Sequence, residues 1–243
     1  MSRSQILLRA ALLAGLALTL YSKFSNGTLV FYINQRFAWL VFVGVLILVI
    51  LALTMAYRLL ERQGASRNAA WHSHKLSLWA ILLLAIPIVL GGVVPARPLG
   101  AGAAAAWGIA QVAPVPAGAA GTVDWTAGGP RTILDWLRAF SREADPATFV
   151  GQEVDVIGFV YRDPRNAADQ FWVARFIISC CAADATAVGL LVHSNRASDF
   201  ENDRWVRVVG RLSVGEFAGE RLPIVLADTI QPTDQPAHPY LYP

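Results

Sequence analysis

The only two cysteines of the chain, Cys180 and Cys181, are adjacent, and Asp184 follows shortly after them. Thiolate sulfur and carboxylate oxygen are ligands for zinc or copper, so these three side chains form a candidate metal site. Adjacent side chains of a regular strand point to opposite faces, so both sulfurs could bind one ion only if the backbone turns there. A structural role, as buried thiols or as a strained disulfide between neighbours, is the competing interpretation.

A second pair of candidate metal ligands is His72 and His74, which are separated by one residue in a basic loop. Such a pair can bind a metal, although solvated histidines near a headgroup layer are common. The sequence contains no pattern typical of a Ser-His-Asp triad, a phosphate-binding glycine loop or an HExxH helix, and the carboxylates of its C-terminal half are scattered. We therefore expect that the protein is not an enzyme.

The two cysteines lie between two apolar runs, residues 171–179 and 188–193. Both runs are rich in β-branched and aromatic residues, which favour strands. The segment between them is small and polar enough to turn. The sequence therefore predicts a β-hairpin whose tip or shoulder carries Cys180, Cys181 and Asp184.

The rest of the C-terminal half has the pattern of a small β domain. Apolar residues at helical spacing predict a helix over 132–142 with Thr132 as its cap, and period-two patterning predicts further strands, each with one buried face and one wetter face. Five strands in about 80 residues favour an all-β, OB-like barrel with one helix, and a sandwich of two small sheets is the alternative. The three further strands are expected at 152–161, 204–212 and 222–230.

The N-terminal half is expected to be a membrane anchor. Hydrophobic residues make up 55 % of the chain and charged residues only 15 %, and the hydrophobic excess lies before residue 95. Three apolar segments predict three transmembrane helices; for the first, a cleaved signal peptide is the competing interpretation. The helices are expected at 5–21, 37–60 and 76–94, and the domains are a membrane domain over 1–95, an Ala/Gly/Pro-rich linker over 96–129 and the β domain over 130–243.

Basic residues are concentrated in the loop between the second and third predicted helices, at Arg58, Arg62, Arg67 and Lys75. The positive-inside rule places this loop and the N-terminus in the cytoplasm. The protein is then a multi-pass protein of the cell membrane with an extracytoplasmic C-terminal domain. We expect membrane lipid as a partner and no nucleic acid, because the net charge of +3 is modest and basic residues are concentrated near the membrane segments.

Four short segments carry a resemblance to a known family. They are residues 27–33, 151–160, 175–184 with its Cys-Cys-x-Ala-Asp motif, and 205–210. With the hydrophobic helices they make the chain similar to the YcgQ-like bacterial family, whose members are provisionally named permease subunits. Members of the family often have more histidine in the loop that here holds only His72 and His74, and this departure weakens the support that the resemblance gives to metal binding.

The resemblance implies a partnership with a larger, many-helix permease of the YraQ type, and it implies no substrate. The chain would then be an accessory subunit of a two-component permease, whose exported domain contacts the permease or its substrate, such as a metal ion. The alternative is a membrane-anchored extracytoplasmic scaffold or binding module unrelated to transport. The residues that we expect to contact a partner or ligand are Tyr32, Arg175, Phe176 and His193.

Overall fold

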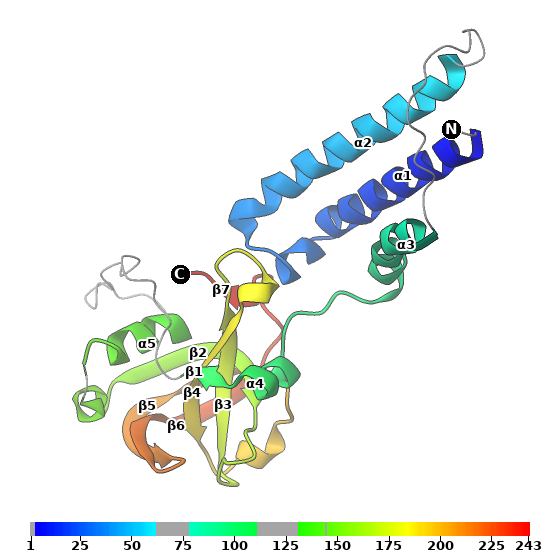
Figure 1. Cartoon of the computed structure of the whole chain (residues 1–243). Helices are drawn as coiled ribbons and strands as arrows, with labels where there is room; N and C mark the ends of the chain where they lie inside the picture. Colours follow the sequence, from blue (N-terminus) through cyan, green and yellow to red (C-terminus); the bar gives the residue numbers. More distant parts are fainter. Residues whose placement is uncertain (1–2, 62–77, 111–130, 144) are drawn as a thin grey trace. The chain divides into compact units, whose positions relative to one another are not determined.

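The computed structural model describes residues 3–61, 78–110, 131–143 and 145–243. The chain divides into two compact units, Met1–Arg97 and Pro98–Pro243. The first unit is helical, and the second is built on a β-sheet (Figure 1). His72, His74 and most of the basic loop used to predict the orientation lie outside the described residues.

In its described part, the first unit contains two long apolar helices, α1 (Arg3–Ser25) and α2 (Ala38–Glu61). The segments Ser4–Ser25 and Gln35–Tyr57 have mean hydropathies of 1.5 and 2.9 and are long enough to cross a membrane. Only 11 % and 6 % of their apolar windows are buried, whereas the core helix of a soluble protein is mostly buried. Outward-facing apolar side chains are typical of a helix surrounded by lipid.

The third predicted helix is shorter in the structure than in the sequence analysis. α3 (Leu78–Val93) has 16 residues and contains Pro87, and residues 76–77 lie outside the described part. At about 1.5 Å per residue it extends roughly 24 Å, less than the hydrocarbon core of roughly 30 Å. Its described length alone therefore does not make α3 a membrane span.

α3 nevertheless packs closely on α1, because glycines lie at their crossing. A Cβ atom added to Gly91 would lie 2.6 Å from Thr19 Cγ2, and one added to Gly15 would lie 3.2 Å from Ile88 Cδ1. Small residues at such a crossing let two backbones approach, which is a common way for helices to associate in a membrane.

Two short 3-10 helices connect α1 to α2, η1 (Thr28–Phe31) and η2 (Gln35–Phe37). The chain enters η1 through Gly27, whose φ of 68° is the left-handed conformation that glycine adopts without strain. Asn34 caps η2, because its side-chain oxygen accepts a hydrogen bond from the Arg36 N–H at 3.0 Å. The predicted loop between these helices is therefore a structured turn.

Within the described residues, the second unit has one seven-stranded sheet in the order β1-β4-β6-β5-β2-β3-β7, so the alternative of two separate sheets is wrong. β3 also pairs with β4, and the pairings therefore run from β4 through β6, β5, β2 and β3 back to β4. The strands are β1 (Ile109–Ala110), β2 (Glu153–Tyr161), β3 (Gln170–Ile177), β4 (Thr186–His193), β5 (Trp205–Phe217), β6 (Glu220–Pro232) and β7 (Tyr240–Leu241).

All five predicted strands are present as β2 to β6, and three of them, β4, β5 and β6, are longer than predicted. β5 and β6 continue toward each other and are joined by Ala218 and Gly219, with φ of 53° and 86°. Positive φ at both central residues is typical of the tight turns that match the twist of a hairpin. The predicted helix is also confirmed, as α5 (Ile133–Phe140), and Thr132 forms a capping box with Asp135 at its start.

The prediction of one buried and one wetter face holds for β5 but is wrong for β3 and β4. Consecutive side chains such as Phe171 and Trp172 are both buried, at 0 % and 2 % exposure. Phe171 belongs to the interior cluster that α5 covers, whereas Trp172 belongs to a second cluster on the other face. That face is covered by α4 (Ala101–Trp107), which packs on β2 and β4.

α4 and β1 lie in the segment that the sequence analysis assigned to the linker. Two hydrogen bonds fix the start of α4: the Leu99 N–H donates to the Tyr240 hydroxyl at 2.9 Å, and the Ala101 N–H donates to Asp203 Oδ1 at 2.5 Å. Asp203 adopts a φ of 67°, which is rare for a non-glycine residue. Residues 98–110 thus belong to the second unit, and residues 111–130 lie outside the described part.

Candidate functional site

The β3–β4 hairpin positions the cysteines, as the sequence predicts. The strands are antiparallel, and their last pair before the turn joins Ile177 to Thr186. The connection contains a 3-10 helix, η4 (Ala182–Asp184), and Cys181 is its N-cap. Both cysteines therefore lie where the chain leaves the sheet, just beyond the regular part of β3.

The two thiols face each other. Their sulfur atoms are 3.6 Å apart, and Cys180 is exposed while Cys181 is half-buried. Both cysteines are free. The condition set by the sequence analysis, that the backbone must turn for the two side chains to share one ion, is met in this loop.

Asp184 organises this loop by accepting hydrogen bonds from three consecutive backbone N–H groups. Its Oδ1 accepts from Ser179 at 3.0 Å, and its Oδ2 accepts from Cys180 at 2.7 Å and from Cys181 at 3.4 Å. Partial burial opposes the charge of Asp184, but hydrogen bonds from the Cys180 thiol and these N–H groups outweigh it and lower the pKa of the carboxyl. Asp184 therefore stays ionised.

The same contact acts in the opposite direction on the thiol. The hydrogen bond to Asp184, followed by the bond to Cys181, raises the pKa of Cys180 to about 11. A thiolate beside a carboxylate is disfavoured, so Cys180 is protonated and weakly nucleophilic at neutral pH. The loop is therefore poorly suited to covalent catalysis through Cys180.

Cys180, Cys181 and Asp184 form the one group of at least three potential metal ligands found in the described residues, with ligand atoms within 4.8 Å of one another. The histidines do not join it. His72 and His74 lie outside the described part, and His193 lies at the opposite end of β4, where it pairs with Gln170. There its Nδ1 is 3.3 Å from Asp169 Oδ2.

Arg175 holds the C-terminal segment of the chain. Its guanidinium donates to the backbone carbonyls of Pro239 at 3.0 Å and Tyr240 at 3.4 Å, and also to that of His238. Burial lowers the pKa of Arg175 to about 10. The side chain thus anchors β7 beside β3, and its predicted contact with a partner remains a prediction.

The other two expected contact residues differ in accessibility. Phe176 is buried and stacks on Phe159 with ring centroids 5.8 Å apart. Tyr32 belongs to the first unit and is 41 % exposed, so it is available at the surface. Four further aromatic residues of β2 and β3, Phe159, Tyr161, Phe171 and Trp172, are all buried and are therefore core residues.

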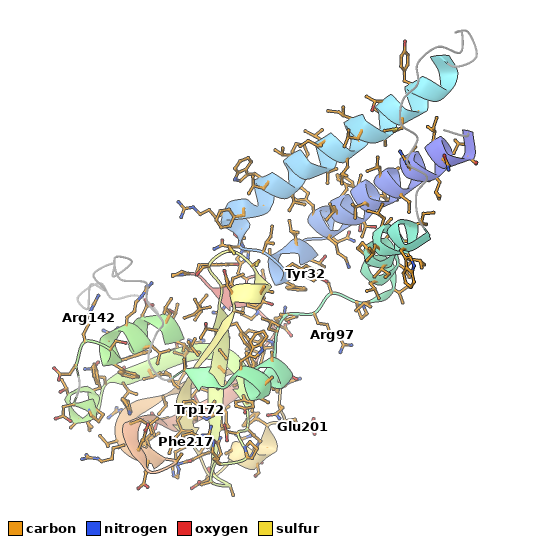
Figure 2. The ribbon with its side chains drawn as sticks, viewed as in Figure 1. Tyr32, Arg97, Arg142, Trp172, Glu201 and Phe217 are labelled. Carbon is orange, nitrogen blue, oxygen red and sulfur yellow. The ribbon has the colours of Figure 1, made fainter. Side chains whose placement is uncertain are left out.

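The sequence analysis missed a cavity of about 300 Å³ beside the β5–β6 turn. Trp172 and Phe217 meet edge to face in its wall, with centroids 5.1 Å apart (Figure 2). Asp163 binds Arg165 through both carboxylate oxygens at 2.8 and 2.7 Å, and the guanidinium lies 5.0 Å from the Phe217 ring centre. Phe217 escaped notice because the sequence analysis ended that strand at residue 212, before it.

Comparison with known proteins places both halves of the chain in one family. Residues 8–110 match the DUF1980 N-terminal domain, and residues 134–243 match the DUF1980 C-terminal domain. A Streptococcus mutans protein provisionally named a two-component membrane permease complex subunit is 26 % identical over 277 aligned positions, covering 97 % of this chain and 99 % of that protein.

A second relative is the UPF0703 protein YcgQ of Bacillus subtilis. It is 29 % identical over 99 residues, which cover 40 % of this chain and 35 % of YcgQ. The two domain matches, the end-to-end relative and the likeness to YcgQ agree with the motifs found in the sequence. The chain belongs to the YcgQ-like family of provisionally named permease subunits.

Proposed function

We propose that this protein is the accessory subunit of a two-component membrane permease. The observation that carries the proposal is the end-to-end match to the Streptococcus mutans protein, which is named as a subunit of such a complex. The apolar, unburied helices α1 and α2 support a membrane location. The larger subunit would be a many-helix permease of the YraQ type, and lipid would surround the anchor.

The anchor in this proposal has three spans, with α3 as the third. Its close packing on α1 through Gly91 and Gly15 supports this assignment, because small residues are enriched where membrane helices cross. With the N-terminus in the cytoplasm, three spans make the protein multi-pass and place the β domain outside. A reporter fused after Pro243 tests this topology: activity of a periplasm- or exterior-dependent reporter is expected, and activity in the cytosol alone contradicts it.

The β domain in this proposal is an OB-like barrel. Taking β2 to β6 as the first to fifth strands, the pairings follow the order one, two, three, five, four and return to one, with the third and fifth strands parallel. This order supports a closed barrel, and the bulge between Val209 and Gly210 supplies a bend of the kind that closure requires. The domain would present its cysteine loop to the permease or to the permease's substrate.

Co-purification tests the proposal directly. The full chain is co-expressed with a YraQ-type permease of the same organism, and an affinity tag on the chain is used to isolate complexes from detergent extracts. We expect the permease at a fixed ratio, and no recovery of an unrelated many-helix membrane protein expressed at the same level. Recovery of the chain alone, under conditions that keep both proteins soluble, contradicts an accessory role.

The cavity lined by Trp172, Phe217, Asp163 and Arg165 favours the second candidate function, a binding module unrelated to transport. Pockets that combine aromatic walls with a few polar groups are typical of small-ligand sites. If the chain purifies alone and its deletion leaves cellular ion content unchanged, this second function gains support. Elemental analysis of cells with and without the gene distinguishes the two.

A further inference from the structure

We infer that Cys180 and Cys181 form an open two-thiolate site for a thiophilic divalent cation such as Zn²⁺, and that Asp184 positions the loop without binding the ion. The inference rests on the proposed function, because it names the class of cargo that the exported domain would present to the permease. The three residues are all potential metal ligands by type, but the inference makes only the two cysteines ligands and makes Asp184 a positioning residue.

The distance between the sulfur atoms fits a shared ion. In a tetrahedral site with Zn–S bonds of about 2.3 Å, two sulfur ligands lie about 3.8 Å apart. The sulfur atoms of Cys180 and Cys181 are 3.6 Å apart before any ion is bound. An ion could therefore bind between them with little movement of the loop.

Asp184 is occupied by the backbone. Both of its oxygens accept hydrogen bonds from backbone N–H groups. The donors are the two cysteines themselves, Cys180 and Cys181, and the residue before them, Ser179. Binding an ion through Asp184 would weaken the contacts that hold the sulfurs together. The carboxylate acts as the support of the site, in the way that groups around a metal centre orient its ligands.

Two coordination positions of a tetrahedral ion would remain open. Within the residues that the structure describes, the cluster contains no further histidine, cysteine or acidic side chain. Structural zinc sites use four protein ligands, whereas a site with open positions can accept water or ligands from another molecule. Binding converts two thiols and M²⁺ into a dithiolate complex and two released protons, so an acceptor that supplies new ligands can take the ion over by returning those protons.

Cation binding by the full chain in detergent tests the site. Because the chain has no other cysteine, the sulfur-to-metal charge-transfer absorption of added Cd²⁺ reports on this pair alone. Zn²⁺ affinity is measured by competition with a chromophoric chelator. We expect one Cd²⁺ per chain with the charge-transfer band, and Zn²⁺ competing for the same site.

Three variants separate ligands from support. The pair Cys180→Ser with Cys181→Ser should abolish the charge-transfer band. Asp184→Asn should keep the band but weaken Zn²⁺ binding by about 10- to 100-fold, the usual loss when a group that orients a metal ligand is changed. Asp199→Asn is the matched control, since Asp199 ends the similar 3-10 helix η5 (Ala197–Asp199). This substitution should leave both the charge-transfer band and the Zn²⁺ affinity unchanged.

Several outcomes would overturn the inference. They are the absence of the band in the wild-type chain, Zn²⁺ binding that survives loss of both thiols, or loss of the Cd²⁺ band in Asp184→Asn while its unfolding temperature stays that of the wild type. Co-purification with the permease is measured on the same samples. If the chain binds its permease but no cation, the proposed function stands and this inference is wrong. If the chain binds the cation but no permease, the cation site stands and the proposed function is wrong.

Discussion

The strand β4 has a short 3-10 helix near each end, and the two ends of the strand are built differently. η4 precedes it beside one exposed and one half-buried cysteine, whereas η5 follows it beside a buried interior that contains Ala197 and Phe200, at 0 % and 5 % exposure. At the η5 end, Arg162 donates to the carbonyls of Ala197 and Phe200. At the η4 end, Asp184 accepts hydrogen bonds from three backbone N–H groups, and neither cysteine belongs to the buried core clusters.

This difference assigns stability of the fold to the η5 end of β4 and ligand binding to the η4 end. At the η5 end, the apolar side chains are buried and the backbone carbonyls are hydrogen-bonded, so substitutions there should lower the free energy of unfolding. The cysteines at the η4 end add little packing, so changes there should act on ligand binding. Substitutions at the two ends of β4 test this contrast.

Replacement of Phe200 by Ala should cause the largest loss. The ring is buried and lies 6.3 Å from that of Phe171 in the interior cluster, and a buried Phe→Ala change typically costs about 3–5 kcal/mol. Denaturant unfolding of the full chain in detergent, followed by near-UV circular dichroism, measures this loss. A loss as small as that of an exposed residue would show that this end of β4 is not a core region.

Replacement of Arg162 by Ala should cost about 2 kcal/mol, because it removes charged hydrogen bonds to two backbone carbonyls that are held in a part-buried turn. The same unfolding measurement applies. Arg211→Ala is the matched control, since the side chains of Arg211 and its partner Glu153 are 64 % and 84 % exposed, and ion pairs at the surface contribute little. Equal losses in the two variants would contradict the assignment of Arg162 as a clamp.

Asp184→Asn should make Cys180 about tenfold more reactive toward iodoacetamide near pH 8, measured in a Cys181→Ser background with Cys181→Ser alone as the reference. Asp184 is the main cause of the raised pKa of about 11, so losing its charge lowers this pKa and increases the thiolate fraction at a given pH. With Asp184 present, the rate should continue to rise to a higher pH than in the Asp184→Asn variant. An unchanged rate would show that the carboxylate does not control the thiol.

The double change of Cys180 and Cys181 to Ser should have the smallest effect on folding, shifting the unfolding temperature by less than about 1 °C when no metal is present. Serine preserves the shape of the side chain, and Cys180 is exposed. Thermal unfolding in the presence of a chelator measures this effect. A large drop would show that the cysteines stabilise the loop, which was the competing structural interpretation.

Local patterns were sufficient to predict most elements of the second unit. The cap at Thr132, the strands and the hairpin all depend on short-range spacing, and the structure confirms them. The second buried face of the sheet could not be predicted in this way. It depends on α4, whose short alanine-rich sequence resembles a linker and whose start is held by contacts with the distant residues Asp203 and Tyr240.

The candidate site was predictable in its residues but not in its geometry. Spacing identifies Cys180, Cys181 and Asp184, yet whether adjacent thiols face each other depends on the three N–H groups that bind Asp184. Nearness in sequence also suggested His193 as a neighbour. An antiparallel hairpin separates the start and end of β4 along its length, so His193 lies beside Gln170 and far from the turn.

The hydroxyl of Tyr240, in the last strand, accepts the Leu99 N–H at the start of the β domain. Arg175 fixes the same C-terminal segment through its backbone carbonyls. Translation begins at the other end of the chain, so the helices leave the ribosome long before Tyr240 does. The hydrogen bond from Leu99 to Tyr240 can therefore form only after all the strands between these two residues have been synthesised.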